Sequence, residues 1–324
     1  MKENILITGG AGYIGSHIVE SLLKKRYRVV VVDNFSTGYK RLLNKKVKFY
    51  RVDINQKLKI NKIIKVNKIT SIFHLAAHLS VGESEKKPKK YYLNNVTGTM
   101  NLLKACINTD VKNFLFSSTC AVYKDGIFKV NEKTKLLPKS VYGKTKLAGE
   151  NLIKSYSKKL NLNYGILRFF NVAGASSTGK IGLIKKGDQL FKNLSIAVMK
   201  KNPVVNIYGD KYNTPDGTCI RDYIHVCDIA DLHLKILNKI KTIKKSIIAN
   251  CGYGYGFSVL QIINKFQKLS RKKINVNIKG KRKGDMEKII SSSSKLKKLI
   301  KWKPKYNNLS LMVKSSITWE KKFK

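Results

Sequence analysis

The chain of 324 residues contains 66 Lys or Arg and 19 Asp or Glu, which gives a formal net charge of +47. Its basic residues are scattered along the sequence, in pairs such as Lys24-Lys25 and Lys158-Lys159. This distribution favours a solvated basic surface over a specific nucleic-acid partner. No apolar run reaches the roughly 18 to 20 residues of a membrane span, and no signal-peptide pattern opens the chain, so we expect a cytoplasmic protein without a membrane partner. Five cysteines without a C-x-x-C pair favour reduced thiols over a disulfide framework or a zinc site, and we expect no metal.

Short β-rich runs alternate with helical patterns through the first half of the chain. The runs expected to form strands are Ile5–Thr8, Arg28–Val32, Lys48–Val52, Ser71–Leu75, Asn113–Ser117 and Tyr164–Phe169. The helical patterns between them include Tyr13–Lys25, Lys57–Val66 and Val96–Ile107. This order predicts an α/β fold with a Rossmann-type, doubly wound parallel sheet, whose ligands bind outside the carboxyl ends of the strands.

The pattern loosens beyond Asn171, where Gly and Ser clusters and irregular segments become frequent. We therefore expect a first domain over residues 1–172 and a smaller, mixed substrate-holding domain over residues 173–324. The segment His225–Gly252 again follows the order strand, helix, strand, so residues 222–252 are candidates to return to the first domain's sheet.

A glycine-rich turn follows the first expected strand and opens the first helix. Gly9, Gly12 and Gly15 allow the backbone to turn tightly and to approach a pyrophosphate at the helix N-terminus. The second strand ends in Asp33, where a carboxylate would bind the adenosine ribose hydroxyls and repel a 2′-phosphate. Together these features predict an NAD-binding domain and favour NAD over NADP.

A tyrosine and a lysine four residues apart, Tyr142 and Lys146, lie on one face of an expected helix. About 25 residues earlier, an apolar strand ends in Ser117-Ser118-Thr119, at the sheet edge where an active site is expected. Free tyrosine has a pKa of about 10, but a neighbouring ammonium and a positive nicotinamide ring both favour the phenolate. Tyr142 is therefore predicted to act as the base in a hydride transfer.

Three stretches together resemble the extended short-chain dehydrogenase/reductase superfamily, namely Thr8–Ser16, Ser117–Tyr123 and Tyr142–Lys146. Within that superfamily the chain resembles the UDP-glucose 4-epimerase family from end to end, through the stretches His74–Pro88, Tyr91–Thr99, Leu167–Ala175, Ile207–Val226 and Lys281–Asp285. The resemblance implies interconversion of UDP-galactose and UDP-glucose in galactose metabolism, by transient oxidation at sugar C4 with tightly bound NAD. It also implies a homodimer formed through helices near Val96–Ile107 and Tyr142–Lys159.

The resemblance also assigns a role to individual residues. Tyr142 would take the proton of the sugar 4-hydroxyl, Lys146 would bind the nicotinamide ribose and lower the pKa of Tyr142, and Thr119 would bind the same sugar oxygen. Besides Tyr142 and Lys146, the residues implied to bind NAD are Gly9, Gly12, Tyr13, Ile14, Gly15, Asp33, Asn34, Asp53, Ile54, Leu75, Ala76, Ala77, Asn94, Ser117 and Phe169. Those implied to bind the UDP-sugar are Thr119, Tyr142, Asn171, Arg221, Arg282 and Asp285.

Several alternatives share this fold. A nucleotide-sugar 4,6-dehydratase needs an acid after the active-site threonine, where this chain has Cys120-Ala121, so elimination is disfavoured. An NAD-binding protein without catalysis would tend to lose Tyr142, Lys146 or Thr119. Epimerases of UDP-N-acetylglucosamine, UDP-xylose or UDP-glucuronate stay open, and Ile289, four residues after Asp285, is a candidate to limit the sugar pocket. Our hypothesis is a preference for UDP-glucose and UDP-galactose over their N-acetylated forms.

Overall fold

The computed structural model describes residues 3–282 and 285–323, which form two compact units. Unit 1 comprises Met1–Val122, Pro138–Arg168 and Ile229–Ala249, and unit 2 comprises Tyr123–Leu137, Phe169–Asp228 and Asn250–Lys324. The sequence predicts an NAD-binding domain over residues 1–172 and a nucleotide-sugar-binding domain over residues 173–324. This assignment of ligands to the two domains stays a prediction. Of the stretch Lys281–Asp285, residues 283 and 284 lie outside the described part of the chain.

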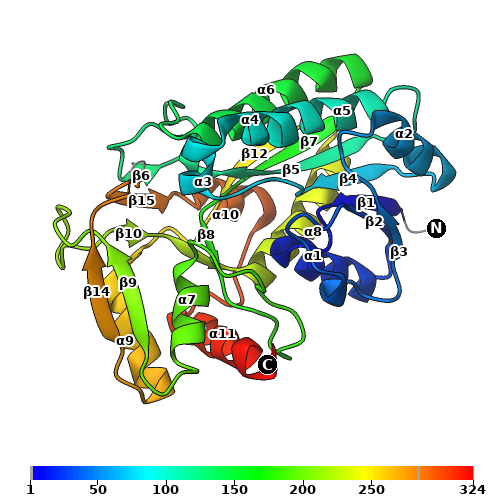
Figure 1. Cartoon of the computed structure of the whole chain (residues 1–324). Helices are drawn as coiled ribbons and strands as arrows, with labels where there is room; N and C mark the ends of the chain where they lie inside the picture. Colours follow the sequence, from blue (N-terminus) through cyan, green and yellow to red (C-terminus); the bar gives the residue numbers. More distant parts are fainter. Residues whose placement is uncertain (1–2, 283–284, 324) are drawn as a thin grey trace. The chain divides into compact units, whose positions relative to one another are not determined.

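A seven-stranded sheet holds unit 1 together, in the order β12-β7-β5-β4-β1-β2-β3 (Figure 1). Its strands are β1 Asn4–Thr8, β2 Arg28–Asp33, β3 Lys48–Arg51, β4 Ser71–His74, β5 Asn113–Thr119, β7 Asn163–Phe169 and β12 Ile247–Cys251. Parallel pairing joins β1 to β2 and β4, β2 to β3, and β4 to β5. The predicted doubly wound parallel sheet is confirmed, and its strand order reverses between β1 and β4.

The core of unit 1 follows from the residues that its strands and helices contribute. The run of four valines in β2 is β-branched and buried, as suits a strand that is covered on both faces. Helix α2, Lys57–Val66, buries Ile60, Ile63 and Ile64, which recur at the spacing of one helical face. In Figure 1, α2, α5 and α6 lie on one face of the sheet and α1 and α8 on the other.

The helices of unit 1 are α1 Tyr13–Lys24, α2 Lys57–Val66, α3 Val81–Lys86, α4 Pro88–Tyr91, α5 Gly98–Ala105, α6 Val141–Leu160 and most of α8 Val226–Ile243. Two 3₁₀ turns, Lys40–Leu42 and Cys120–Val122, accompany them. The helix expected over Val96–Ile107 differs in the structure, because a π-helical turn, Tyr92–Thr97, precedes α5. The buried side chain of Asn95 lies within this turn.

Unit 2 is a mixed assembly of short strands and helices. A four-stranded sheet has the order β13-β10-β15-β6, and two further pairs are β11-β8 and β14-β9. The strands are β6 Lys129–Val130, β8 Asn171–Ala173, β9 Val204–Tyr208, β10 Ile220–Arg221, β11 Tyr223–His225, β13 Phe257–Ser258, β14 Asn275–Lys279 and β15 Lys288–Ser291. The helices are α7 Leu190–Ala197, α9 Val259–Ser270, α10 Ser294–Ile300 and α11 Leu309–Phe323.

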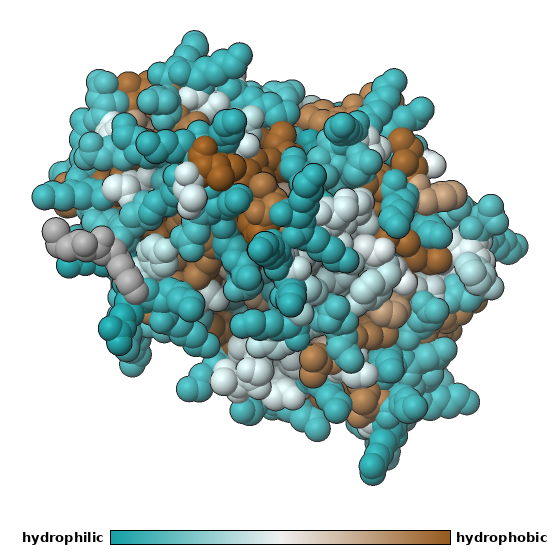
Figure 2. Space-filling model, turned by 180° about the vertical axis from the view of Figure 1, so that it is seen from behind, coloured by the Kyte–Doolittle hydropathy of each residue, from teal (hydrophilic) through white to brown (hydrophobic). Residues whose placement is uncertain are grey.

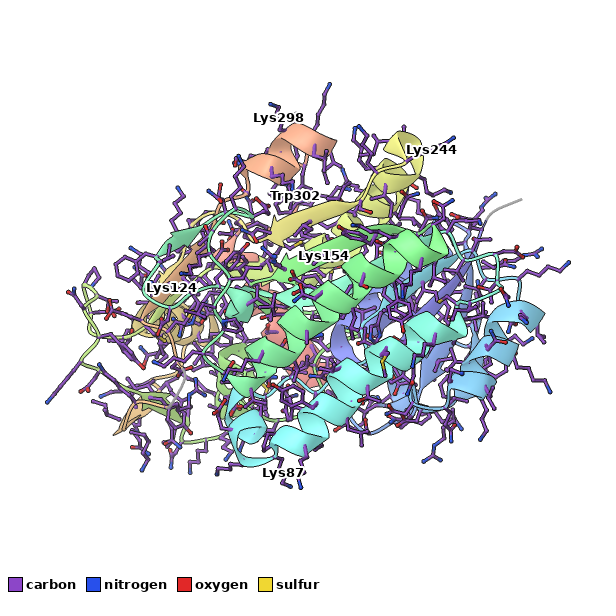
Figure 3. The ribbon with its side chains drawn as sticks, turned by 90° about the horizontal axis from the view of Figure 1, so that it is seen from above. Lys87, Lys124, Lys154, Lys244, Lys298 and Trp302 are labelled. Atoms are coloured by element: carbon purple, nitrogen blue, oxygen red, sulfur yellow. The ribbon has the colours of Figure 1, made fainter. Side chains whose placement is uncertain are left out.

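Lysines project from many separate elements. Figure 3 labels Lys87, Lys124, Lys154, Lys244 and Lys298, which come from five different segments. On the face shown in Figure 2, apolar residues occur as small groups separated by hydrophilic ones. Among the residues that the structure describes, every helix is too short or too polar to cross a bilayer.

Candidate active site

The glycine-rich turn brings the N-terminus of α1 against the ends of two strands. Gly9 has a φ of +74°, and a Cβ there would lie 2.7 Å from the Ala76 nitrogen, so both conformation and space require glycine. A Cβ at Gly15 would lie 2.2 Å from the Gly9 carbonyl oxygen. Gly12 caps α1 without a side chain, and the first turn contains no acidic residue. Tyr13 and Ile14 supply the next backbone N–H groups, so this end of the helix suits an anion.

The carboxylate of Asp33 lies beside this turn, at the end of β2. It accepts hydrogen bonds from the backbone N–H groups of Ala11 (3.0 Å) and Phe35 (2.8 Å). Burial raises its pKa, and these two bonds oppose that effect. A Cβ at Gly38 would lie 2.9 Å from either carboxylate oxygen, so Gly38 keeps space next to it. A carboxylate has about four acceptor positions, so two remain for the hydroxyls of a ribose.

Asp53 lies at the same edge of the sheet, two residues after the end of β3. Its carboxylate accepts a hydrogen bond from the Asn34 side chain (2.7 Å) and two from Asn55. Burial alone would raise the pKa of Asp53, but these bonds outweigh it and lower the pKa. The adjacent Ile54 is buried under Gly98, where a Cβ would lie 2.5 Å from its Cδ1. Asn34, Asp53 and Ile54 thus form one bonded group, as expected for neighbouring parts of a cofactor site.

A buried hydrogen-bond chain links the strand that precedes the glycine-rich turn to α6, the helix that carries Tyr142. The Thr8 hydroxyl bonds His74 Nδ1 (2.7 Å), and His74 Nε2 bonds the Thr99 hydroxyl (2.9 Å), which donates to the Asn95 carbonyl (2.6 Å). The Asn95 amide donates to Thr145, whose hydroxyl donates to the Tyr142 carbonyl. Burial lowers the pKa of His74 to about 3, so this side chain is a neutral structural link and not an acid.

The side chain of Asn95, within the π-helical turn, is fully hydrogen-bonded. It accepts hydrogen bonds from the backbone N–H of His78 (2.9 Å) and the side chain of Asn94 (2.9 Å), and it donates to the His78 carbonyl (3.1 Å) and to Thr145 (3.2 Å). All four hydrogen-bonding positions of this buried amide are therefore used. The loop Leu75–Ala77, which leads from β4 to His78, begins with a bond from the Leu75 N–H to the Thr8 carbonyl.

Tyr142, Lys146, Thr119 and Ser117 meet at the carboxyl end of β5. Ser140 caps α6 by accepting from the Gly143 N–H, and the Tyr142 N–H donates to the Ser84 hydroxyl. Lys146 Nζ donates to the Ser117 carbonyl (2.8 Å) and lies 4.8 Å from the centre of the Phe116 ring. The Thr119 hydroxyl is hydrogen-bonded to the Tyr142 side chain. The predicted constellation therefore lies in one buried place.

Burial shifts the pKa values of both Tyr142 and Lys146. Burial raises the pKa of Tyr142 above its ordinary value, and the hydrogen bond from Thr119 only partly opposes this. Burial also lowers the pKa of Lys146 to about 7, although the Glu150 carboxylate favours the ammonium form. The lower Tyr142 pKa that the resemblance implies, through Lys146 and a bound nicotinamide ring, stays a prediction, because desolvation is the largest effect on Tyr142 among the protein groups alone.

Three of the four residues expected at the uridine diphosphate lie together in unit 2. Arg282 pairs with Asp285 (2.8 Å) and lies 4.5 Å from the Tyr208 ring, and Arg282, Asp285 and Arg221 all act on the pKa of Cys219. Two carbonyl groups, those of Ile220 and Glu287, accept from Arg221 Nη1.

Two further predicted residues and one hollow belong to unit 2. Asn171 is exposed, begins β8, and donates its backbone N–H to the Asp222 carbonyl (3.0 Å). Phe169 ends β7 on the same side of the unit boundary. Asp285 also lines a hollow together with Tyr212 and Lys281. Ile289 is buried and lies opposite Arg221 in the β10–β15 pair, so its proposed influence on the sugar pocket stays a prediction.

Sequence reasoning missed three residues that touch these groups. Tyr208 lies under Arg282, and Glu150 and Arg168 form a buried ion pair behind Lys146. Glu150 follows Lys146 by four residues on the same helix, and this spacing was a usable signal. The alternation of exposed and buried residues along β9 points Tyr208 outward, but only the fold brings Arg282 over it.

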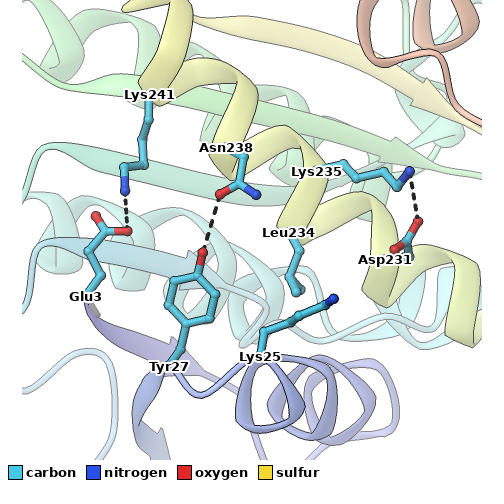
Figure 4. Close-up of a pocket in the computed structure, with 8 residues that line it drawn as sticks. All are labelled: Glu3, Lys25, Tyr27, Asp231, Leu234, Lys235, Asn238 and Lys241. Carbon is cyan, nitrogen blue, oxygen red and sulfur yellow. Dashed lines mark hydrogen bonds and ion pairs between the residues drawn. The ribbon is translucent and has the colours of Figure 1, made fainter. Parts of the chain in front are cut away.

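A second hollow lies at the opposite edge of the unit 1 sheet. Figure 4 shows it between α8 and the segments around Glu3 and Tyr27, with Lys241 paired to Glu3 (2.7 Å) and Lys235 near Asp231 (3.7 Å). Glu3 precedes β1, so this hollow is at the amino ends of the strands. Ligands of open α/β sheets bind at the carboxyl ends, so we do not assign it to the cofactor.

The residues at the carboxyl edge fit a dinucleotide. The glycine-rich turn excludes side chains where a pyrophosphate would approach, Asp33 offers acceptors for a ribose, and Lys146 and Tyr142 stand beside Ser117 at the end of β5. In the part of the chain that the structure describes, His, Cys, Asp and Glu side chains form no cluster of three that could hold a metal ion.

Comparison with known proteins points the same way. The model of the NAD dependent epimerase/dehydratase family matches residues 5–252. The UDP-glucose 4-epimerase of Halalkalibacterium halodurans is 39% identical over 319 residues, which is 98% of this chain and 95% of that protein. The structure of UDP-glucose 4-epimerase from Bifidobacterium longum with NAD+ and UDP is 33% identical, with a TM-score of 0.92 and 98% of each chain covered. The UDP-Glc/GlcNAc 4-epimerase of Campylobacter jejuni is 38% identical, with a TM-score of 0.85 and 99% of each chain covered.

Proposed function

Because this chain belongs to the NAD dependent epimerase/dehydratase family, we propose that it is an enzyme that interconverts UDP-galactose and UDP-glucose with NAD bound throughout the cycle. The observation that carries the proposal is the meeting of Thr119, Tyr142 and Lys146 at the carboxyl end of β5, in the same unit as the glycine-rich turn. The relatives named UDP-glucose 4-epimerase, which match nearly the whole chain, support the choice of substrate.

NAD, when bound, would supply the acceptor for the hydride of sugar C4, and the 4-keto sugar would have to turn over within the site to take the hydride back on the other face of C4. The protein residues move the proton. Tyr142 takes it from the 4-hydroxyl as C4 is oxidised, and gives it back as the 4-keto group is reduced, so the cycle has no net redox change. Thr119, hydrogen-bonded to Tyr142, holds the same sugar oxygen. Lys146 is proposed to bind the nicotinamide ribose.

Burial makes this proton transfer conditional. The raised pKa of Tyr142 keeps its hydroxyl protonated at neutral pH while no further positive charge lies beside it. A cationic nicotinamide ring would favour the phenolate, because opposite charges a few ångströms apart stabilise each other in a poorly solvated site. The base is therefore active only in the state in which the hydride acceptor is present.

For the nucleotide, we propose that Arg221 and Arg282 bind the diphosphate and Asp285 the uridine ribose, and that Asn171 also binds the UDP group. A guanidinium has five donors in a planar fork, which suits a diphosphate. Arg221 donates some of these hydrogen bonds to backbone carbonyl groups, and these bonds fix the orientation of its guanidinium. The Arg282–Asp285 pair orients both side chains in the same way.

The decisive experiment is to incubate the pure protein with UDP-galactose and no added cofactor, to measure UDP-glucose, and to assay NAD after denaturation. Product and about one NAD per chain are expected. Tyr142→Phe should abolish turnover and retain NAD, whereas Tyr156→Phe, a matched change on the same helix, should leave turnover close to that of the wild type. Native turnover by Tyr142→Phe would show that the base is assigned wrongly.

UDP-N-acetylglucosamine is a second candidate for the sugar substrate, because one relative carries it in its name. The Campylobacter jejuni relative is named a UDP-Glc/GlcNAc 4-epimerase, and its identity to this chain equals that of the Lactobacillus helveticus UDP-glucose 4-epimerase, at 38%. We propose a preference for the sugars without the acetamido group. Turnover of UDP-N-acetylglucosamine at a rate comparable to UDP-glucose would refute it.

We further propose a homodimer in the cytoplasm, acting in galactose metabolism. Helices α5 and α6 lie side by side in Figure 1 and Figure 3, next to exposed apolar side chains of Tyr92, Leu93 and Ile107. Exposed apolar side chains at both ends of α5 are compatible with burial in an interface between two copies of the chain. Light scattering should give twice the chain mass, and Leu93→Asp should reduce it to the mass of one chain.

A further inference from the structure

Directly behind Lys146, unit 1 contains an ion pair that is shielded from solvent. Arg168 donates to Glu150 from Nε (2.9 Å) and from Nη2 (2.7 Å), and the side chains are 1% and 0% exposed. The Ser118 hydroxyl donates to the same carboxylate (2.6 Å). A buried pair of charges is seldom retained for stability alone, because desolvation offsets most of the attraction. Its position suggests what else it does.

Two adjacent residues at the end of β5 are tied to α6 by opposite charges. Lys146 binds the carbonyl of Ser117, and Glu150, one helical turn later, binds the hydroxyl of Ser118. The next residue is Thr119, which contacts Tyr142. The end of β5, which carries Ser117 and Thr119, is therefore held by hydrogen bonds to an ammonium and a carboxylate on the same face of α6.

We propose that Glu150 is a positioning residue for Lys146 and Tyr142, and that Arg168 balances its charge so that the catalytic groups ionise in the correct pH range. The inference rests on the proposed function, because it assumes that Tyr142 is the base and Lys146 its partner. Geometry carries it through the shared strand end. In support, the Glu150 carboxylate raises the pKa of Lys146 against the effect of burial.

Several other ionisable groups face this pair. They are His74 on β4, Tyr91 and Cys120 near Tyr142, and Tyr164 on β7 near Glu150. His74 has a pKa of about 3, and burial and nearby anionic groups raise the pKa values of Tyr91 and Tyr164. These three are therefore uncharged near neutral pH, where a thiol is also mostly protonated. The net charge beside Lys146 is set by Glu150 and Arg168.

The sign of each substitution follows from this balance. Glu150→Gln leaves the Arg168 cation unopposed, which disfavours the Lys146 ammonium and favours the Tyr142 phenolate. Both limbs of the pH profile of kcat should then move to lower pH by about one unit or more, the shift typical of one nearby charge. Arg168→Gln leaves the carboxylate unopposed and should move both limbs to higher pH. The double variant should return them near the wild-type values.

A structural role alone would give a different result. It would lower kcat in all three variants without an ordered shift of the limbs. A matched control is Glu320→Gln, which breaks the ion pair of unit 2 between buried Lys192 and partly buried Glu320 (2.6 Å) and should leave the limbs in place. NMR of isotope-labelled lysine in the protein without cofactor reads the pKa of Lys146 directly, with Lys146→Arg used to assign the signal. It should fall in Glu150→Gln and rise in Arg168→Gln.

Unmoved limbs and an unchanged Lys146 pKa in a folded Glu150→Gln protein would overturn the inference. If this variant does not fold, Arg168→Gln and the double variant carry the test, and the same absence of shifts overturns it. Failure of the proposed function has a different signature, since the wild type would then not convert UDP-galactose, or Tyr142→Phe would convert it at the native rate.

Discussion

Gly15→Ala should weaken NAD binding through steric overlap with the backbone of Gly9 and Gly10. The new Cβ would lie 2.2 Å from the Gly9 carbonyl oxygen, whereas ordinary contact begins at 3.4 Å, so the shortfall is 3.4 minus 2.2, or 1.2 Å. The contacted atom belongs to the backbone, so no rotamer change can relieve the overlap, and the turn itself must move by about 1 Å. Overpacking of this kind costs about 1–3 kcal/mol.

A competing effect has the opposite sign. Alanine is favoured over glycine in a helix by about 1 kcal/mol, so the free energy of unfolding of the NAD-free protein should change little. The displaced turn must return to its place when the pyrophosphate binds, so the strain appears in the affinity. We expect NAD binding to weaken by about 5- to 140-fold, since each 1.4 kcal/mol is a factor of ten.

The assay measures NAD per chain after purification and the dissociation constant by calorimetry. Gly82→Ala is the matched control, because Gly82 lies in α3 and, among the described residues, no neighbouring atom lies within 4 Å of the place that a Cβ would take there. This control should bind NAD as the wild type does. Unchanged NAD affinity in Gly15→Ala would refute the view that backbone closeness at this turn makes the site.

Three further predictions concern charge. In NAD-free protein, ultraviolet titration of the wild type against Tyr142→Phe should show no Tyr142 phenolate below pH 10, because burial raises its pKa; ionisation near neutral pH without cofactor would contradict this. Asp33→Asn should reduce the preference for NAD over NADP about tenfold or more. The variant loses one charge-assisted hydrogen bond to the adenosine ribose, of about 1.5 kcal/mol or more, and also the charge that repels the 2′-phosphate of NADP. The dissociation constants of both dinucleotides check this prediction. The pKa of His74 is about 3 in the folded protein and 6.5 ordinarily, so between these two pH values the unfolded chain binds more protons than the folded protein. The free energy of unfolding therefore falls by about 1.4 kcal/mol for each pH unit as the pH is lowered through this range. Urea unfolding should show a smaller slope of stability against pH in His74→Gln, with the remainder partly due to His233, whose pKa is about 4; an identical slope would argue against a neutral His74.

Local sequence predicted the parts of this molecule that depend on neighbouring residues. The valine run of β2, the three isoleucines of α2 and the glycine-rich turn each carry their own periodicity or conformational demand, and the strands deviate from the expected ranges by two residues or fewer. Tyr142 and Lys146 were predictable for the same reason, as a helix places residues four apart on one face.

Contacts between distant residues were not predictable in this way. Asn95, within the π-helical turn, is hydrogen-bonded to His78 and Thr145, which are 17 and 50 residues away. Glu150 on α6 and Arg168 on β7 are brought together by the tertiary fold. The raised pKa of Tyr142 likewise depends on how completely the folded chain removes water from its hydroxyl. Such effects arise from burial, which one-dimensional patterns report poorly.

The π-helical turn also limits how the length of this chain can vary. An α-helix turns about 100° per residue, so an added or missing residue rotates everything after it by that angle. If one residue were deleted between Tyr92 and Thr97, Asn95 could keep its bonds to His78 and Thr145 or Leu102 and Leu103 could keep their places in the core, but not both. The π-helical turn sets the rotation between Asn95 and the core residues Leu102 and Leu103, so that each side chain faces its own partners. Insertions and deletions should therefore be tolerated here less well than substitutions.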